Sequence, residues 1–357
     1  MRCMFICSHQ TLLDFEVPLL LKSNCEVFVV KKLDSVNKQY LTVKQNTKIL
    51  DYYDSYLTIP KEEIDKLNNE DWYNNNYKSE ELIHILNKNF DFIICTLLTD
   101  GVFLNQLKNS FKGKICFRFF GREHPHNYNF FFSKINLSEN QKFQYWFSYE
   151  EVLDWEFKNH QLIKKDNCFI VPIGYSETFI DKYIDSWNPI NNKICFVCSK
   201  VNLCGYYTNI YNTFEKNFSD FIINDKVIVL GCNNIKNNSF FKNDLDNEDF
   251  FNEIKSSSVM YYHSNEPRHL HYHPFEAIII GMPVIFHSQS LLSSFLPDSP
   301  GKCTSLEEVK EKIQLVLDKD ESFISSVLES QKKCRELIHP KNLLNIFEPI
   351  LDKIKNN

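Results

Sequence analysis

Short apolar runs alternate with amphipathic segments along most of this chain. The runs are rich in β-branched and aromatic side chains, which predicts buried strands. In the first half they lie at Cys3–Ser8, Glu26–Lys32, Phe90–Leu98, Lys114–Gly121 and Cys168–Gly174. In the second half they lie at Lys193–Lys200, Asp225–Gly231, Ser258–Ser264 and Pro283–Phe286.

Segments with helical spacing separate these runs. In the first half they are Leu12–Leu21, Lys61–Leu67, Ser79–Asn87, Leu104–Phe111 and Phe147–Lys158. In the second half they are Tyr206–Phe218, Glu248–Ser256, Leu306–Leu317, Ser322–Leu337 and Asn342–Lys355. Ser79 and Ser305 stand where an N-cap side chain accepts free backbone N–H groups. Strands that alternate with helices predict an α/β fold in which helices cover both faces of parallel sheets.

The alternation stops and restarts near Trp187-Asn188-Pro189. A chain of 357 residues is also long for a single core. We therefore predict two Rossmann-like domains, residues 1–186 and 187–338. Ligands of open parallel sheets bind beyond the carboxyl ends of the strands. This rule selects the loops at Asp100, Gly121–His126, Ser199–Lys200, Gly231–Cys232 and His263–Glu276, which line one cleft if the sheets of the two domains face one another.

The segment His271–Phe286 carries the strongest local signals for a binding site. Pro274 suits the first turn of a helix, and Gly281 can adopt the left-handed conformation that ends one. Pro283–Phe286 then continues as a buried strand. A helix N-terminus attracts an anion, and the carboxylate of Glu276 beside it can accept hydrogen bonds from sugar hydroxyls. Together these features predict a pocket for a nucleotide sugar.

Composition and charge exclude several other classes of protein. The formal net charge of −6 predicts no general attraction to nucleic acid. The sequence has no GxGxxG after its first strand, no GxxxxGK[ST] and eight glycines, which disfavours dehydrogenases and P-loop proteins. It also has no apolar run near the ~20 residues of a membrane helix and no secretory signal at its start. We expect a cytoplasmic protein.

Cysteines and histidines raise the question of a metal site. Most of the twelve cysteines lie in apolar runs, where reduced thiols act as small hydrophobic groups. Cys195 and Cys198 would point to opposite faces of one strand, which disfavours a shared metal. His263, His269, His271 and His273 cluster in sequence, but no cysteine or carboxylate completes a familiar ligand spacing. We expect no metal, and contacts from one or two of these histidines to a donor or acceptor.

The segment Pro274–Ile285, PFEAIIIGMPVI, resembles a motif of the donor domain in retaining "group 1" glycosyltransferases of the GT-B fold. That motif has a Glu, seven residues, a second Glu followed by Ala, a short apolar stretch, Gly, any residue and Pro-Val-Ile. Phe169–Ile180 and Thr304–Glu321 also resemble segments of these enzymes, so the resemblance covers residues 169–320. It implies a GT-B fold and a final segment, residues 339–357, that crosses back to the N-terminal domain.

The sequence departs from that motif at its first Glu. Arg268 stands eight residues before Glu276, and the nearest upstream carboxylate is Glu266. Either a longer loop lets Glu266 take the family role, or Arg268 replaces it. An arginine there would place a guanidinium near the donor sugar or phosphate and would suit an anionic sugar.

The resemblance assigns Glu276 to the ribose and Lys200 to the diphosphate. Arg268 offsets phosphate charge, and either Glu266 or Arg268 acts at the reacting centre. His273, Pro274, Phe275 and Gly231 complete the donor site. On the acceptor side Glu123 and His124 could orient or deprotonate a hydroxyl, beside Arg122, His126 and Asp100. Structural roles remain open for all of these residues, such as a helix N-terminal Glu276, a solvated Lys200, a Glu266–Arg268 ion pair and a turn at Asp100.

The sequence thus predicts a metal-independent, cofactor-free, retaining glycosyltransferase that acts in polysaccharide biosynthesis. Its partners would be a nucleotide-sugar donor and a glycan or glycolipid acceptor, with peripheral association at the inner face of a membrane compatible with the latter. A nucleotide-sugar epimerase or phosphorylase on the same fold is one alternative. A non-catalytic sugar-binding subunit is another, because the first Glu of the motif is displaced.

Overall fold

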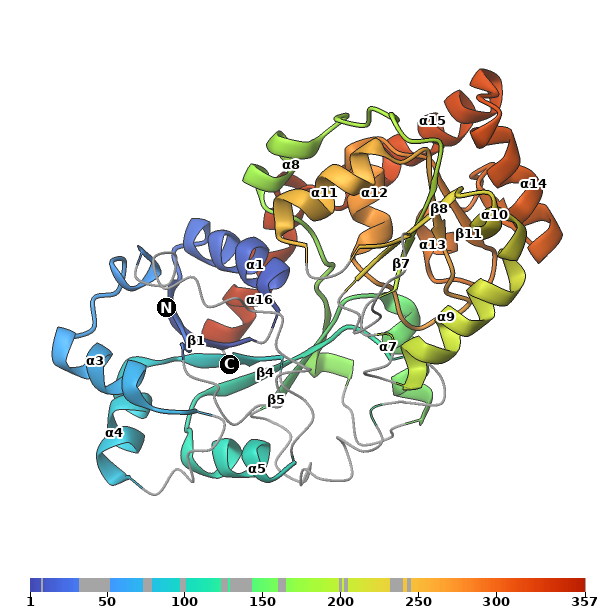
Figure 1. Ribbon diagram of the computed structural model, residues 1–357. Coiled ribbons are helices and arrows are strands. Elements are labelled where there is room, and N and C mark those ends of the chain that lie inside the picture. The colour runs from blue at the N-terminus through green and yellow to red at the C-terminus, as the bar shows by residue number, and fades with distance from the viewer. Residues whose placement is uncertain are drawn as a thin grey trace. The chain divides into compact units, whose positions relative to one another are not determined.

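The chain folds into two compact units, each built around a parallel sheet. One unit is Met1–Glu177 together with Ile338–Asn357, and the other is Thr178–Leu337. The computed structural model describes residues 1–7, 9–31, 52–72, 79–96, 101–122, 128, 143–159, 165–198, 201, 205–231, 240–242 and 245–356. Figure 1 traces these elements from the blue N-terminus to the red C-terminus.

The sheet of the first unit has the strand order β2-β1-β3-β4-β5-β6. Its strands are β1 Arg2–Ile6, β2 Glu26–Val29, β3 Phe92–Cys95, β4 Lys114–Phe119, β5 Phe143–Phe147 and β6 Cys168–Ile170. All neighbours are parallel; Cys3, for example, pairs with Val27 on one side and Phe92 on the other. The helices of this unit are α1 Gln10–Lys22, α3 Lys61–Asn69, α4 Glu80–Asn89, α5 Gly101–Ser110, α7 Glu150–Asn159 and α16 Pro340–Asn356, with a 3-10 turn at Lys165–Asn167.

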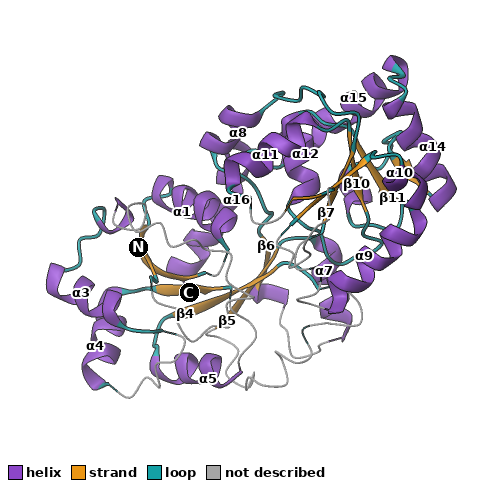
Figure 2. Cartoon of the chain, in the orientation of Figure 1, coloured by secondary structure: helices purple, strands orange, loops and turns teal. Residues whose placement is uncertain are grey.

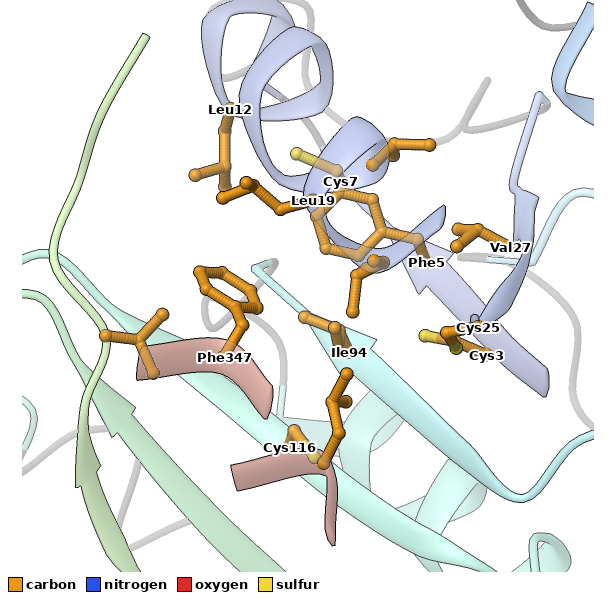
Figure 3. Close-up of a cluster of buried hydrophobic side chains, with 14 of the residues drawn as sticks. Cys3, Phe5, Cys7, Leu12, Leu19, Cys25, Val27, Ile94, Cys116 and Phe347 are labelled. Carbon is orange, nitrogen blue, oxygen red and sulfur yellow. The ribbon is translucent and has the colours of Figure 1, made fainter. Parts of the chain in front are cut away.

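Helices α1 and α16, which come from opposite ends of the chain, lie side by side in the first unit (Figure 1). Leu343, Phe347 and Leu351 of α16 enter the same buried cluster as Phe5 and other apolar residues of β1 and α1. Figure 3 shows Phe347 near Leu12, Leu19 and Ile94 in this cluster. The apolar face of α16 is therefore part of the hydrophobic core of the first unit.

A buried ion pair also joins α1 to the sheet of the first unit. Arg118 of β4 and Glu16 of α1 are both fully buried, and Arg118 Nε donates to Glu16 Oε1 over 2.7 Å. The same guanidinium donates to Ser148 Oγ over 2.9 Å and reaches the carbonyls of Trp146 and Pro172. The arginine thereby ties three neighbouring strand ends to one helix.

The sheet of the second unit has the strand order β12-β11-β10-β7-β8-β9, again with all neighbours parallel. Its strands are β7 Ile194–Val197, β8 Val227–Leu230, β9 Phe241–Lys242, β10 Val259–Tyr262, β11 Val284–His287 and β12 Lys302–Cys303. Its helices are α8 Glu177–Tyr183, α9 Gly205–Asn217, α10 Ser219–Ile223, α11 Asn247–Ser256, α12 His273–Ile280, α13 Leu292–Phe295, α14 Leu306–Leu317 and α15 Glu321–Leu337.

Helices cover both faces of this second sheet, as Figure 2 shows for the purple helices around the orange strands. On one face α9 and α14 pack on alternate strand residues, and the ring of Phe214 stacks on that of Phe196 at 3.8 Å. On the other face α12 packs on β10 and β11, between α11 and α15. The predicted α/β class with parallel sheets is confirmed.

Most predicted elements are present, and two of the predicted helix caps are confirmed. Ser79 Oγ accepts from the backbone N–H of Leu82, and Ser305 Oγ accepts from that of Glu308. The prediction of a helix from Phe147 was wrong at its start, because Phe147 ends strand β5 and pairs with Phe119 and Ile170. The run at Cys168–Gly174 forms a strand only as far as Ile170.

Candidate functional site

The candidate donor site is built at the carboxyl end of β10, where a loop of residues 263–272 leads into α12. Helix α12 begins at His273, has Pro274 in its first turn and ends at Gly281. Gly281 has φ 86°, the left-handed conformation predicted from the sequence. Strand β11 then starts at Val284. The predicted loop, helix, glycine stop and strand are thus confirmed in this order.

Every residue of α12 is buried, so the helix is fixed from all sides. Its C-terminal turn is held by Gln331 of α15, a residue only 1% exposed. Gln331 Nε2 donates to the carbonyl of Met282 over 2.9 Å, and Gln331 Oε1 accepts from the N–H of Val284 over 2.9 Å. One side chain thereby satisfies the backbone on both sides of Pro283, and this anchors the turn between α12 and β11.

Glu276 lies in the first turn of α12 and is 8% exposed. Burial raises the pKa of its carboxyl group to about 8 because the charged form loses water. The group is therefore largely protonated at neutral pH. Hydroxyl groups that donate to it would stabilise the carboxylate and lower this pKa again.

Glu266 and Arg268 form an ion pair within the loop. Arg268 Nε and its backbone N–H both donate to Glu266 Oε1, each over 3.2 Å. The side chain of Glu266 is 10% exposed and that of Arg268 is 13% exposed. The loop is anchored further by the backbone of Glu266, which donates to Ser264 Oγ and accepts from the N–H of Leu291. The two residues that were alternatives for the first Glu of the motif therefore lie side by side in one loop.

Four histidine rings gather beside the N-terminus of α12. The ring centres are 5.8 Å apart for His263 and His271, 5.2 Å for His271 and His273, and 4.7 Å for His269 and His271. Burial lowers the pKa of His263 to about 3 and keeps those of His271 and His273 well below the usual range. These three rings are therefore neutral at pH 7.

The buried hydroxyl of Tyr262 orients one of these rings. It lies 3.2 Å from His271 Nδ1 and accepts from the backbone N–H of His271 over 3.3 Å. On the opposite face of the sheet the Tyr261 hydroxyl binds His287 Nε2 over 2.8 Å. Tyr262 and His287 were not predicted as site residues; their positions at the carboxyl ends of β10 and β11 were the available signal.

The remaining predicted site residues are less completely described. Gly231 directly follows β8, at the same edge of the sheet as His263. Arg122 follows β4 in the first unit, with its guanidinium carbon 5.2 Å from the centre of the Tyr128 ring. The predicted residues that lie outside the described ranges are Asp100, Glu123, His124, His126 and Lys200.

Two cavities in the second unit lie away from this histidine-rich loop. One, of about 640 Å³, is lined by Asn188, Asn191 and Ser256, which precede β7 and β10 at the amino edge of the sheet. The other, of about 330 Å³, lies between α12 and α15 near Asp185 and Arg335. Ligands of parallel sheets bind at the opposite, carboxyl edge, so we assign the donor site to the loop and α12 rather than to either cavity.

The described ranges contain neither a metal-binding cluster nor a helix that could span a membrane. No group of three or more His, Cys, Asp or Glu side chains there is arranged to hold a metal ion. Each helix in the described part of the chain is too short or too polar to span a lipid bilayer. The cysteines described are free thiols.

Comparison with known proteins gives a result for the fold. No protein-family model matches the sequence, and no curated protein matches it by sequence. A glycosyltransferase from Rickettsia africae superposes with a TM-score of 0.62 at 13% identity, over 100% of this chain and 99% of the other. A sucrose-phosphate synthase from Thermosynechococcus elongatus gives 0.61 at 10% identity, over 100% and 99% of the two chains.

The Anabaena protein HepE, solved in complex with UDP and glucose, is also similar. Its TM-score is 0.61 at 8% identity, over 99% of this chain and 100% of HepE. At such low identities the superpositions establish a shared architecture, and they extend over both units. The chain therefore has the GT-B fold, which it shares with these three structures.

Proposed function

We propose that the chain is a glycosyltransferase that moves a sugar from a nucleotide-sugar donor to a glycan or lipid-linked glycan. The donor binds at the carboxyl edge of the second sheet, where the histidine-rich loop meets α12. The observation that carries this proposal is the buried carboxyl group of Glu276 in the first turn of α12. The whole-chain likeness to HepE, which was solved with UDP and glucose, supports it.

In this proposal Glu276 accepts hydrogen bonds from the ribose hydroxyls of the donor. A buried carboxyl group is costly to ionise without partners, and a vicinal diol supplies two donors to it. Ribose binding therefore converts Glu276 to the carboxylate. The group then distinguishes a ribonucleotide from a deoxyribonucleotide, which lacks one of the two hydroxyls.

The donor diphosphate lies at the N-terminus of α12, which attracts anions. Arg268, held by Glu266, and Lys200 offset the charge that develops as the nucleoside diphosphate leaves. Gly231, Pro274 and Phe275 shape the site around the nucleotide. By the resemblance, either Glu266 or Arg268 acts at the reacting sugar.

The acceptor side of the proposal rests on the first unit. Glu123 and His124 orient or deprotonate the acceptor hydroxyl, and Arg122, His126 and Asp100 bind the acceptor. The reaction retains the anomeric configuration and needs neither metal nor cofactor. Its proposed setting is the cytoplasm, at the inner face of a membrane where polysaccharides are assembled.

Nucleotide-sugar binding is the direct test. Thermal unfolding of the full chain is measured with UDP-, GDP-, ADP- and CMP-sugars, because a ligand of the folded state at 100 times its Kd stabilises it by about 2.7 kcal/mol. We expect one nucleotide to raise the Tm. Glu276→Gln, which loses a charge-assisted hydrogen bond, should weaken that binding about 10- to 100-fold, whereas Glu311→Gln on the exposed face of α14 should not. Failure of all four nucleotides would refute the proposal.

Product analysis then separates the alternatives. A glycosyltransferase releases nucleoside diphosphate at a rate that rises with an acceptor, and the product anomer reports retention or inversion. An epimerase converts the donor without any acceptor, and a phosphorylase requires inorganic phosphate. Binding without turnover, in the presence of a glycan mixture, would identify a sugar-binding subunit. Activity in EDTA tests the metal-independence.

A further inference from the structure

Several ring nitrogens of the histidines beside α12 make no hydrogen bond within the described part of the chain. Within the described part of the chain, no group lies within hydrogen-bond distance of either ring nitrogen of His263, of His271 Nε2 or of His273 Nε2. All four nitrogen atoms are buried, although His263 and His271 as whole residues are partly exposed. Buried polar atoms without partners are unfavourable. Such a cluster is therefore arranged for a ligand with several hydrogen-bonding atoms.

The three rings lie close enough to contact one small group. Their centres are separated by 5.8 Å for His263 and His271, 5.2 Å for His271 and His273, and 6.4 Å for His263 and His273. Tyr262 holds His271 through Nδ1, which leaves Nε2 for a ligand. His273 is itself the first residue of α12. The unsatisfied nitrogens and the positive end of the helix therefore lie together.

The charges around the cluster favour an anion as the ligand. A helix N-terminus repels a cation and attracts an oxyanion. The nearby carboxyl groups provide no compensating negative charge, because Glu266 is paired with Arg268 and burial keeps Glu276 largely protonated at neutral pH. Among the described residues, the titratable and charged side chains around the three rings are Tyr207 of α9, Tyr261 and Tyr262 of β10, Glu266, Arg268 and His269 of the loop, Glu276 of α12 and His287 of β11.

We propose that His263, His271 and His273 form an oxyanion site that takes up protons from solvent when the donor diphosphate binds. This inference rests on the proposed function for the identity of the anion. Burial keeps the three rings neutral, since each positive charge would lose water and would repel the charges on the neighbouring rings. A bound phosphate group reverses this balance, because an opposite charge at short range favours imidazolium. Each protonated ring can then donate from both nitrogens.

Two anions make the inference testable apart from the proposed function. Sulfate remains a dianion across the pH range and carries no ribose, so its binding reports the histidines without a contribution from Glu276. UDP-glucose carries its phosphates as diesters, which hold no further titrating proton near neutrality. Calorimetric titration of the full chain with each anion, in PIPES and in Tris at the same pH, measures the protons exchanged, because the buffers have different ionisation enthalpies.

We expect sulfate to bind with proton uptake, and its affinity to rise about tenfold per pH unit of acidification for each proton taken up. His263→Asn and His273→Asn should reduce or abolish the uptake. His84→Asn, at an exposed position of α4, should leave it unchanged. UDP-glucose binding to the Glu276→Gln chain should show proton uptake, because the amide that replaces the carboxyl group has no proton to release.

The outcomes separate the two claims. Proton uptake on sulfate binding, without binding of any nucleotide sugar, would support the oxyanion site and refute the proposed function. Nucleotide-sugar binding with identical heats in both buffers, together with sulfate binding that is independent of pH, would refute the oxyanion site and leave the proposed function intact. The measurement on the unmodified chain decides the question even where a histidine variant fails to fold.

Discussion

Replacement of Glu276 by glutamine tests whether this carboxyl group is buried and neutral in the folded chain. Burial raises its pKa to about 8, whereas an exposed glutamate titrates near 4.5. Between these values the unfolded chain has lost this proton and the folded chain has kept it. The free energy of unfolding therefore falls as pH rises, by about 1.4 kcal/mol per pH unit and by roughly 5 kcal/mol over the whole window.

Glutamine does not ionise, so the Glu276→Gln chain lacks this decline. We expect its stability to approach that of the unmodified chain near the lower limit of the window and to exceed it by roughly 5 kcal/mol above about pH 8. Urea unfolding followed by circular dichroism, at intervals from about pH 5 to about pH 9, measures the difference. Ile278→Val, in the same buried helix, is the control and should cost about 1 kcal/mol at every pH. A Glu276→Gln difference that is equally constant would show that the carboxyl group is ionised in the folded chain.

Three further predictions concern the side chains of Arg118, Gln331 and His263. Arg118→Met leaves Glu16 buried without its partner and should cost about 3–5 kcal/mol in urea unfolding, whereas adding Glu16→Leu should recover most of this loss; additive costs would contradict the pairing. Gln331→Leu removes both hydrogen bonds to the turn before β11, and a loss of about 2–3 kcal/mol is expected, with faster amide exchange at Val284 as the local readout. His263, with a folded pKa of about 3 against an ordinary 6.5, contributes stability that is lost as pH falls below 6.5, so His263→Asn should flatten the acid decrease in Tm; an unchanged decrease would disprove its burial in the neutral form.

Local signals explain why the segment around α12 could be predicted from the sequence. Pro274 and Gly281 restrict the backbone at either end of the helix, and the apolar run after Pro283 has no polar face. Each signal acts within a few residues, so it survives without knowledge of the fold. The same reasoning predicted the caps at Ser79 and Ser305.

Long-range pairings explain most of what was missed. Gln331 reaches the α12–β11 turn from 47 residues away, and Arg118 reaches Glu16 across 102. Strand β5 was overlooked because its aromatic run, Phe143–Phe147, directly precedes a helical pattern and has no alternation. It becomes a strand through pairing with β4 and β6, which the local sequence does not encode. The four histidines were visible in the sequence, but the packing of their rings against one another was not.

The first unit contains residues from both ends of the chain, and this affects the order in which the units fold during synthesis. The second unit is continuous, so all of its strands have left the ribosome when residue 337 emerges. The first unit still lacks Phe347 and the rest of α16 at that moment, and the apolar surface beneath them remains exposed. We therefore expect co-translational folding to finish the second unit first, although it is synthesised later, and chaperones to favour nascent chains that end shortly before residue 340.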